Sequence, residues 1–139
     1  MLIANQRGTS TMLLAALIVA LTVVLLLVTA IVVARARGKY GIRAPATTGH
    51  PAFDRAFRVQ ANTQEAALMF LPAFALSVWL GGGRLAAAFG AVWLVARVWY
   101  VAAYLRDAGK RGPAFALGMV MQVALLVQVF ADLARAAAG

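Results

Sequence analysis

Cysteine is absent from this chain, and histidine and acidic residues are scarce. His50 is the only histidine, and Asp and Glu together number 4 among 139 residues. Without cysteine there is no disulfide, no thiolate metal ligand and no cysteine nucleophile. A single histidine also leaves too few ligands for a dedicated metal site. We therefore expect no metal centre, and no reaction that depends on a thiol of the protein itself.

Charged residues make up only 12% of the chain, whereas 64% of the residues are hydrophobic. Soluble domains are about 45–50% apolar and about 25% charged. A chain of this length cannot hide so much apolar surface in a core of its own, so lipid is the expected solvent for much of it. The length predicts a single domain, residues 1–139.

The net charge of +9 is the feature that first suggests a nucleic-acid partner. The basic residues, however, occur in short tracts beside apolar runs and do not form one solvated face. Such tracts are typical of the loops that flank membrane helices. We therefore expect no binding to nucleic acid.

Four apolar segments are long enough to cross a bilayer, whose hydrocarbon core of about 30 Å requires about 20 helical residues. The first contains no charged residue from Met12 to Ala34. It exceeds the apolar part of a signal peptide, about 7–15 residues, and basic residues follow it directly, which favours a retained span. The expected spans are residues 12–34, 56–80, 84–106 and 113–133. They predict an all-α integral membrane bundle of four helices.

Glycine and proline mark the expected helix ends. Gly81-Gly82-Gly83 predicts a tight turn after the second span, because glycine adopts the left-handed conformations that helix ends require. Pro113 suits the first turn of the last helix, because backbone N–H groups there have no acceptor within the helix and proline, which lacks an N–H, costs no hydrogen bond. Proline and glycine also indicate a first loop over residues 35–53, and a further loop is expected at residues 107–112.

The distribution of Lys and Arg predicts the orientation. One side of the expected bundle carries many basic residues: Arg35, Arg37, Lys39, Arg43, Arg106, Lys110 and Arg111, with Arg55 and Arg58 close by. The other side carries only Arg7, Arg84 and Arg135. The positive-inside rule then places both basic loops in the cytoplasm and both termini on the opposite side.

Polar residues inside the expected spans are the candidates for function, because ionisable groups are costly in a membrane. They share helix faces by their spacing: Arg58, Asn62 and Glu65 in the second helix, and Arg97, Tyr100 and Tyr104 in the third. At the basic end, these two faces offer cations, a carboxylate, an amide and two phenols. This set suits a small, polar, net anionic ligand, whose carboxylates arginines bind in a forked geometry.

A structural interpretation of the same residues stays open. Glu65 and Arg97 would then form a buried ion pair that fixes the register of the helices, with Asn62 as an interhelical hydrogen-bonding group. Spacing alone does not separate the two interpretations.

Three segments of the chain resemble the MAPEG family, the membrane-associated proteins in eicosanoid and glutathione metabolism. They are FDRAFRVQANTQE at residues 53–65, ARVWYVAAY at residues 96–104 followed by Arg111, and APATTGHP at residues 44–51. The resemblance covers roughly residues 35–111, and the combination of the first two segments is its most specific part.

The resemblance implies a homotrimer with glutathione sites between neighbouring subunits, open to the cytoplasm. It implies that Arg58, Asn62 and Glu65 bind the backbone of glutathione, and that Arg37 reaches in from the adjacent subunit. Arg111 matches the arginine that acts on the glutathione sulfur. The residues around the ligand would be Gln60, Arg97, Tyr100 and Tyr104.

Two positions place this chain within the family pattern. Ala66 stands where one catalytic branch has a tyrosine, so one ligand contact is missing. Arg58 and Glu65 are retained here, whereas the non-catalytic, lipid-binding branch lacks both, which favours a working site.

The function expected from this resemblance is that of a membrane-bound glutathione transferase or peroxidase. Glutathione would be the cosubstrate, and an apolar small molecule would arrive from the membrane lipids. Two alternatives stay open: a membrane protein that binds a lipid or thiol metabolite without turnover, and a structural subunit of a membrane complex.

Overall fold

The computed structural model describes residues 2–138, apart from the side chains at positions 2–7 and 82. Its elements are α1 (Leu2–Tyr40), α2 (Pro51–Ser77), the π-helical segment η1 (Val78–Gly82), α3 (Gly83–Arg106), the 3-10 segment η2 (Ala108–Arg111) and α4 (Gly112–Ala138). The predicted all-α bundle is confirmed. Four helical stretches are long and apolar enough to cross a membrane, as expected for a multi-pass membrane protein.

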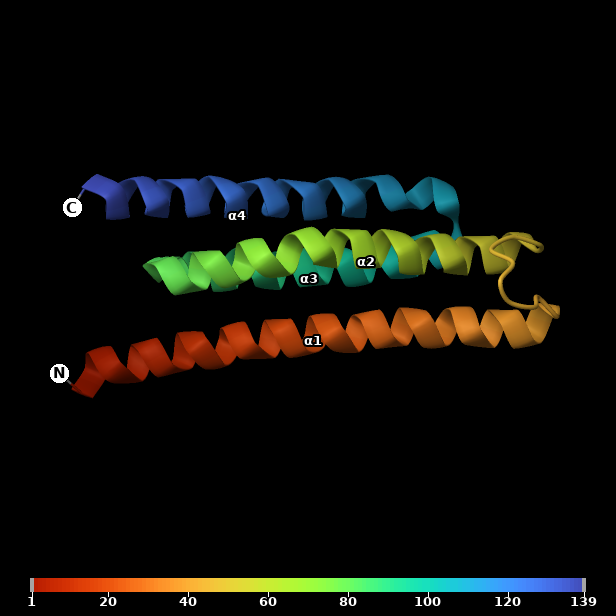
Figure 1. Ribbon diagram of the computed structural model, residues 1–139, viewed down its shortest axis with the longest axis horizontal. Coiled ribbons are helices and arrows are strands. Elements are labelled where there is room, and N and C mark those ends of the chain that lie inside the picture. Colours follow the sequence, from red (N-terminus) through yellow and green to blue (C-terminus); the bar gives the residue numbers. More distant parts are fainter. Residues whose placement is uncertain (1, 139) are drawn as a thin grey trace.

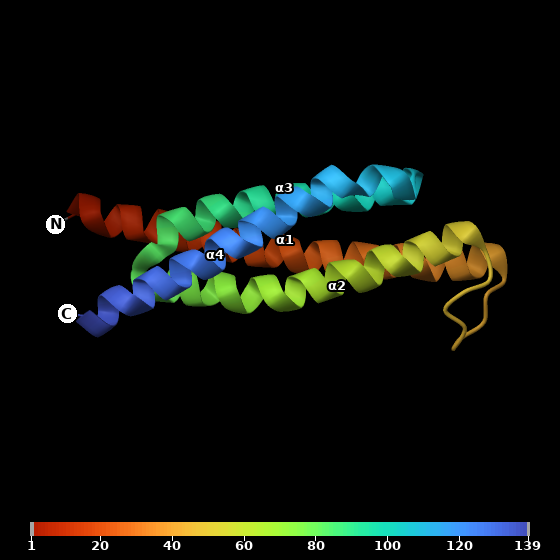
Figure 2. The ribbon, with the colours of Figure 1, turned by 90° about the horizontal axis from the view of Figure 1, so that it is seen from above.

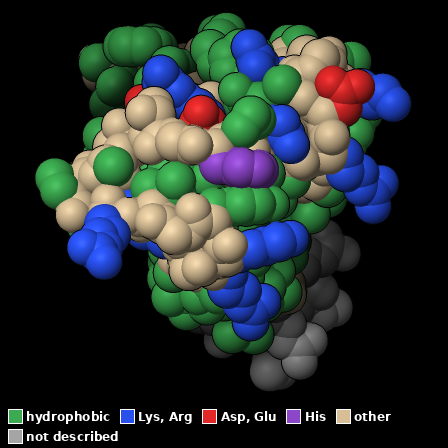
Figure 3. Space-filling view, turned by 90° about the vertical axis from the view of Figure 1, so that its right-hand side faces the viewer, with side chains coloured by type: hydrophobic (Ala, Val, Ile, Leu, Met, Phe, Trp, Pro, Cys, Tyr) green, Lys and Arg blue, Asp and Glu red, His purple; other side chains and the backbone are tan. Residues whose placement is uncertain are grey.

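The helices form a bundle in which α2 and α3 lie side by side as the middle layer (Figure 1), and α4 crosses this pair obliquely (Figure 2). Helices α1 and α4 flank this pair on opposite sides in Figure 1. Both chain ends lie at one end of the bundle, and the loop of residues 41–50 lies at the other, where Lys and Arg side chains gather (Figure 3). We call this second end the basic end.

The boundaries of α1 and α2 differ from those predicted. The loop expected from residue 35 begins only after Tyr40, so Arg35, Arg37 and Lys39 lie in the last turns of α1. Basic side chains are favourable there because they face the negative end of the helix dipole. Gly41, with φ of 65°, makes the left-handed turn that follows the helix. The second helix begins at Pro51, where the His50 ring nitrogen Nδ1 accepts a hydrogen bond from the Ala52 N–H at 3.2 Å.

The turn predicted at Gly81-Gly82-Gly83 is confirmed at Gly81, whose φ is 101°. It lies inside η1, where the chain reverses direction, so that α2 and α3 run antiparallel (Figure 2). The last helix begins at Gly112, so Pro113 is its second residue, in the expected first turn.

Aromatic packing between α2 and α3 forms the centre of the bundle. The rings of Phe70 and Trp93 are stacked, with centroids 3.8 Å apart and planes inclined by 2°. The Phe74 ring follows along α2 and packs against Gly90 of α3, so closely that a β-carbon at Gly90 would lie 2.6 Å from the ring. The glycine therefore sets how near the two helices approach.

Replacing Gly90 with alanine is expected to destabilise the bundle by about 1–3 kcal/mol, the usual cost of overpacking a core. Phe74 is almost fully buried and stacks on Phe70, so its ring must shift and lose part of that packing to admit a β-carbon. The measurement is the denaturation midpoint of the purified protein in detergent. Gly38→Ala is the control, since its β-carbon would meet no atom within 4 Å. Equal midpoints for the two variants would contradict this description of the packing.

Candidate functional site

A hydrogen bond between α2 and α3 lies at the centre of the predicted polar site. The Asn62 side-chain amide donates to the Tyr100 hydroxyl at 2.7 Å. Asn62 is half-buried, and Tyr100 is almost fully buried. The structure thus brings together one member of each predicted polar face.

Tyr104 and Arg111 extend this site toward the basic end. The rings of Tyr100 and Tyr104 meet edge to face with centroids 5.6 Å apart. The Arg111 guanidinium carbon lies 4.6 Å from the centre of the Tyr104 ring, a cation–π contact, and its side chain is exposed. The site therefore has a solvent-accessible cation beside two phenols.

Arg111 reaches this position through a turn. The α3 helix ends at Arg106, and the next residue, Asp107, has extended backbone angles. The Asp107 carboxylate accepts a hydrogen bond from the Gly109 N–H at 2.9 Å and caps η2. A continuation of the third helix to Arg111, which its seven-residue spacing from Tyr104 suggests, is therefore not formed.

Arg97 lies beneath the site and is only 2% exposed. Its guanidinium carbon lies 4.8 Å from the centre of the Tyr100 ring and 5.6 Å from that of Trp93. Gly118 of α4 lies next to it, since a β-carbon there would be in ordinary van der Waals contact with Nη2 of Arg97, at 3.7 Å. Nitrogens Nε and Nη1 are buried and form no hydrogen bond with the described residues.

The proposed ion pair between Glu65 and Arg97 is not formed. Glu65 is exposed on the outer face of α2, whereas the Arg97 guanidinium is enclosed by aromatic rings in the bundle. Among the side chains that the structure describes, the only ion pair joins Asp132 and Arg135. The interpretation of Glu65 and Arg97 as an ion pair that fixes the helix register is therefore wrong. The Arg97 cation is stabilised by the faces of aromatic rings instead.

Arg58 and Glu65 occupy the outer face of α2, two helical turns apart. Of the three residues predicted to share a face of this helix, only Asn62 reaches α3. Among the described residues, neither the Arg58 nor the Glu65 side chain has an ion-pair or hydrogen-bond partner. Gln60 is half-buried on the same helix. Both charges therefore lie on the surface of a helix that is apolar enough to span a membrane.

Arg37 is held at the basic end by the first loop. Its Nη1 donates to the Ala46 carbonyl at 2.8 Å, and its guanidinium carbon lies 4.9 Å from the centre of the Phe53 ring. The described chain does not bring Arg37 into contact with Asn62, Tyr100 or Arg111.

An apolar groove lies between α2 and α4 and begins about one helical turn beyond Glu65. Its volume is about 480 Å³, within the range of about 300–1,000 Å³ that is typical of ligand sites. It is lined by Leu68, Met69, Pro72, Ala73, Leu76, Met119, Gln122, Val123 and Leu126. We call it the α2–α4 groove.

Several buried polar residues were not predicted from the sequence. They include Ser77 on α2 and Gln122, Gln128 and Asp132 on α4. Gln122 donates to the Met69 carbonyl at 3.0 Å and links α4 to α2. The only available signal was polarity, because these glutamines and this aspartate interrupt an otherwise apolar helix.

The fold and the site together define a multi-pass membrane protein with a polar, arginine-containing site at one end of a four-helix bundle. Residues 13–131 match the MAPEG family. The chain belongs to the MAPEG family, as its sequence resemblance predicted.

Relatives of this chain include proteins from bacteria and mammals. An uncharacterized protein of Synechocystis sp. is 47% identical over 112 residues, which are 81% of this chain and 82% of that protein. Human microsomal glutathione S-transferase 2 is 36% identical over 94 residues, 65% of this chain and 61% of that protein, which is less than two thirds of its length. Leukotriene C4 synthase of Cavia porcellus is 32% identical over 108 residues, 74% of this chain and 69% of that enzyme.

A double-mutant cycle with Asn62→Leu and Tyr100→Phe tests the hydrogen bond between α2 and α3. Polar contacts between membrane helices contribute about 0.6 kcal/mol on average and up to about 1.7 kcal/mol, and the expected coupling falls in this range. The measurement is the free energy of unfolding of the two single variants and the double variant in mixed micelles. Strict additivity of the two single changes would show that the contact does not contribute.

Proposed function

We propose that this protein is a membrane-bound, glutathione-dependent transferase or peroxidase. Its site would activate the glutathione thiolate against an apolar electrophile from the bilayer. The observation that carries the proposal is the exposed Arg111 guanidinium, which lies against Tyr104 beside the Asn62–Tyr100 hydrogen bond. Membership of a family that includes glutathione S-transferases supports it.

The polar residues of the site match the chemical groups of glutathione, a tripeptide with carboxylates, an ammonium group and amides. Arg58 is exposed and free to bind a carboxylate in forked geometry. Glu65 is exposed on the same face and suits an ammonium group. The Asn62 amide donates to Tyr100, so its oxygen stays available to accept from a peptide N–H. Gln60 lies on the same helix, with Arg97, Tyr100 and Tyr104 on α3 beneath the site.

Arg111 is the proposed catalytic residue. Glutathione supplies a thiol, and a free thiol has a pKa of about 8.5, so that it is mostly protonated at neutral pH. A guanidinium within hydrogen-bonding reach stabilises the thiolate and lowers that pKa, and each unit corresponds to about 1.4 kcal/mol. The contact with the Tyr104 ring limits the positions that the Arg111 side chain adopts. Arg97 and Tyr100 are second candidates for the same task.

The α2–α4 groove offers a route for the apolar substrate. Its first lining residue, Leu68, follows Glu65 on α2, so the polar face and the groove adjoin along one helix. Such a molecule would reach the groove from the lipid without crossing water. Conjugation and hydroperoxide reduction both fit this arrangement.

The exposed charges of α2 support assembly with further copies of the chain. Charged groups that face lipid cost several kcal/mol, so they are normally covered by protein or water. A homotrimer would cover Arg58 and Glu65 and complete a site between subunits. Arg37, which lies apart from the other site residues within one chain, would then be supplied by the neighbouring copy.

The proposed arrangement in the membrane is a single domain, residues 1–139. It would cross the bilayer at residues 12–34, 56–80, 84–106 and 113–133. The positive-inside rule places the basic end in the cytoplasm, where glutathione would enter the site from water.

Replacing Arg111 with alanine is expected to abolish thiolate formation in the complex with glutathione. The bound thiol would then return toward its ordinary pKa, which leaves only a few per cent of thiolate at neutral pH. The measurement is the ultraviolet absorbance of the thiolate after rapid mixing of purified protein with glutathione. Lys110→Ala is the matched control, since Lys110 is an exposed cation of the same segment.

A thiolate signal that survives Arg111→Ala would overturn the assigned role. Calorimetric titration with glutathione, combined with an assay of conjugation to a chlorodinitrobenzene probe, tests the function itself. Binding without product would mean that the protein holds its ligand without turnover. Absence of binding would remove glutathione as the cosubstrate.

A further inference from the structure

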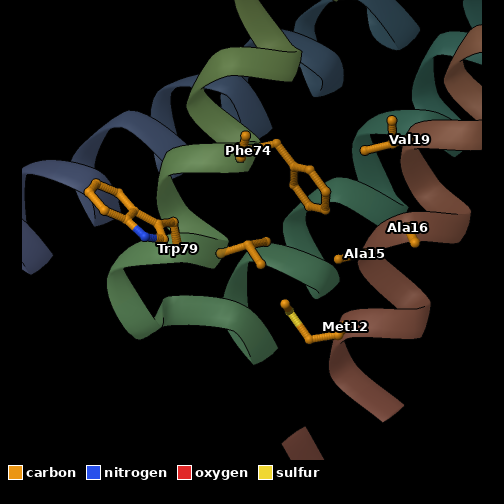
Figure 4. A pocket seen from close by; sticks show the side chains of 8 residues that line it. Met12, Ala15, Ala16, Val19, Phe74 and Trp79 are labelled. Atoms are coloured by element: carbon orange, nitrogen blue, oxygen red, sulfur yellow. The ribbon is translucent and has the colours of Figure 1, made fainter. Parts of the chain in front are cut away.

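A second apolar groove lies at the end of the bundle opposite the basic end, between α1 and the end of α2 (Figure 4). Its volume is about 400 Å³. The lining residues are all apolar: Met12, Ala15, Ala16, Val19, Phe74, Ala75, Val78 and Trp79. We call it the α1–α2 groove. The glutathione mechanism does not use it.

Small residues create this groove. Alanine at positions 15, 16 and 75 leaves space between the two helices, and the Phe74 ring, which points toward α1, closes its deep end (Figure 4). From Met12 to Val19 the groove follows about 10 Å of the α1 axis, at 1.5 Å per residue. It therefore runs along the helices, which is the direction of acyl chains in a bilayer.

The mouth of the groove lies where α2 passes through η1 into α3, at the level expected for lipid head groups. Trp79 is 80% exposed at this edge, and an indole ring combines an apolar body with a polar N–H that suits the membrane interface. Both the shape and the position of the groove therefore match a lipid with its head group at the mouth.

A cation follows directly on the residue of α3 that packs beside the start of the groove. A β-carbon at Gly83 would lie 3.1 Å from the Thr11 methyl group, so the first turn of α3 packs against α1 beside Met12. The next residue, Arg84, is exposed, and its side chain has no ion-pair or hydrogen-bond partner in the described part of the chain. Arg135, also at this end, is paired with Asp132. Arg84 is thus an uncompensated positive charge at head-group level.

We propose that the α1–α2 groove binds one phospholipid with a net negative head group. One acyl chain fills the groove between Met12 and Val19, the indole of Trp79 lies beside the glycerol region, and Arg84 binds the phosphate. The uncompensated charge of Arg84 favours an anionic head group over a zwitterionic one, in which a choline cation offsets the phosphate. This site is independent of the proposed glutathione site, which lies at the other end of the bundle.

Native mass spectrometry of the delipidated protein tests this site. The full-length protein is titrated with phosphatidylglycerol and with phosphatidylcholine of the same acyl chains. Wild-type protein is expected to bind a first phosphatidylglycerol molecule more tightly than phosphatidylcholine. Ala16→Phe, which fills the groove, is expected to weaken this binding roughly tenfold, or about 1.4 kcal/mol. Ala34→Phe is the control, since Ala34 is an exposed alanine of the same helix outside the groove.

Arg84→Gln tests the contribution of the head group to binding separately from that of the acyl chain. This exposed substitution is expected to leave lipid binding in place and to remove the preference for phosphatidylglycerol, whereas Arg106→Gln at the basic end is expected to keep that preference. Equal affinity of wild-type protein for the two lipids, or wild-type affinity in Ala16→Phe, would overturn the proposal.

A second copy of the chain is the other occupant to test for. Because the chain has no cysteine, Ala16→Cys introduces a single reactive site in the groove. Efficient disulfide cross-linking between copies at this position, unaffected by added phosphatidylglycerol, would show that protein fills the groove and would refute the lipid site. Cross-linking that is absent or suppressed by the lipid supports it.

Discussion

The hydrogen bond that joins the polar faces of α2 and α3 is the contact on which the candidate site depends. Asn62 lies in the middle of a helix that is long and apolar enough to span a membrane, and it finds its partner in the hydroxyl of Tyr100 at 2.7 Å. The bond turns the polar faces of α2 and α3 toward each other, in the same orientation that the stacking of Phe70 on Trp93 requires. This orientation of the two helices determines which way their other side chains point.

With the helices in this orientation, the polar residues of α2 and α3 fall into two sets. On α3, Tyr100 and Tyr104 turn inward, and Arg111 returns to them through the Asp107 turn. On α2, Arg58 and Glu65 are left on the outer face. Within a single chain, Arg111 is exposed beside the Tyr104 ring, whereas the charges of Arg58 and Glu65 lie on the outer face of α2. Charges on the outer face of an apolar helix are costly in lipid, which supports the proposed assembly with further copies of the chain.

The sequence predicts the bundle well because long apolar runs leave few alternatives. It also identifies the polar faces of α2 and α3, since helical periodicity places Asn62 and Tyr100 on them. Periodicity does not identify which neighbour a face meets, and for this reason the pairing of Glu65 with Arg97 was wrong. The Arg97 guanidinium lies instead against the rings of Trp93 and Tyr100 on its own helix.

Helix ends were predicted less well than helices. The first helix continues to Tyr40, because a basic sequence without proline is compatible with a helix as well as with a loop. The position of Arg111 depends on a short turn capped by Asp107, which spacing along an ideal helix does not reveal. Buried polar groups such as Ser77 and Asp132 carry no distinctive motif.

A structure of the protein in lipid nanodiscs with glutathione tests the central claim most directly, namely that the polar faces of α2 and α3 form a binding site completed by a neighbouring copy. The expected result is density for the tripeptide in contact with Arg58, Asn62 and Glu65, with its sulfur nearest Arg111 and with Arg37 contributed by the adjacent subunit. A structure in which Arg58 and Glu65 face lipid, or in which protein seals the site without room for the ligand, would contradict it.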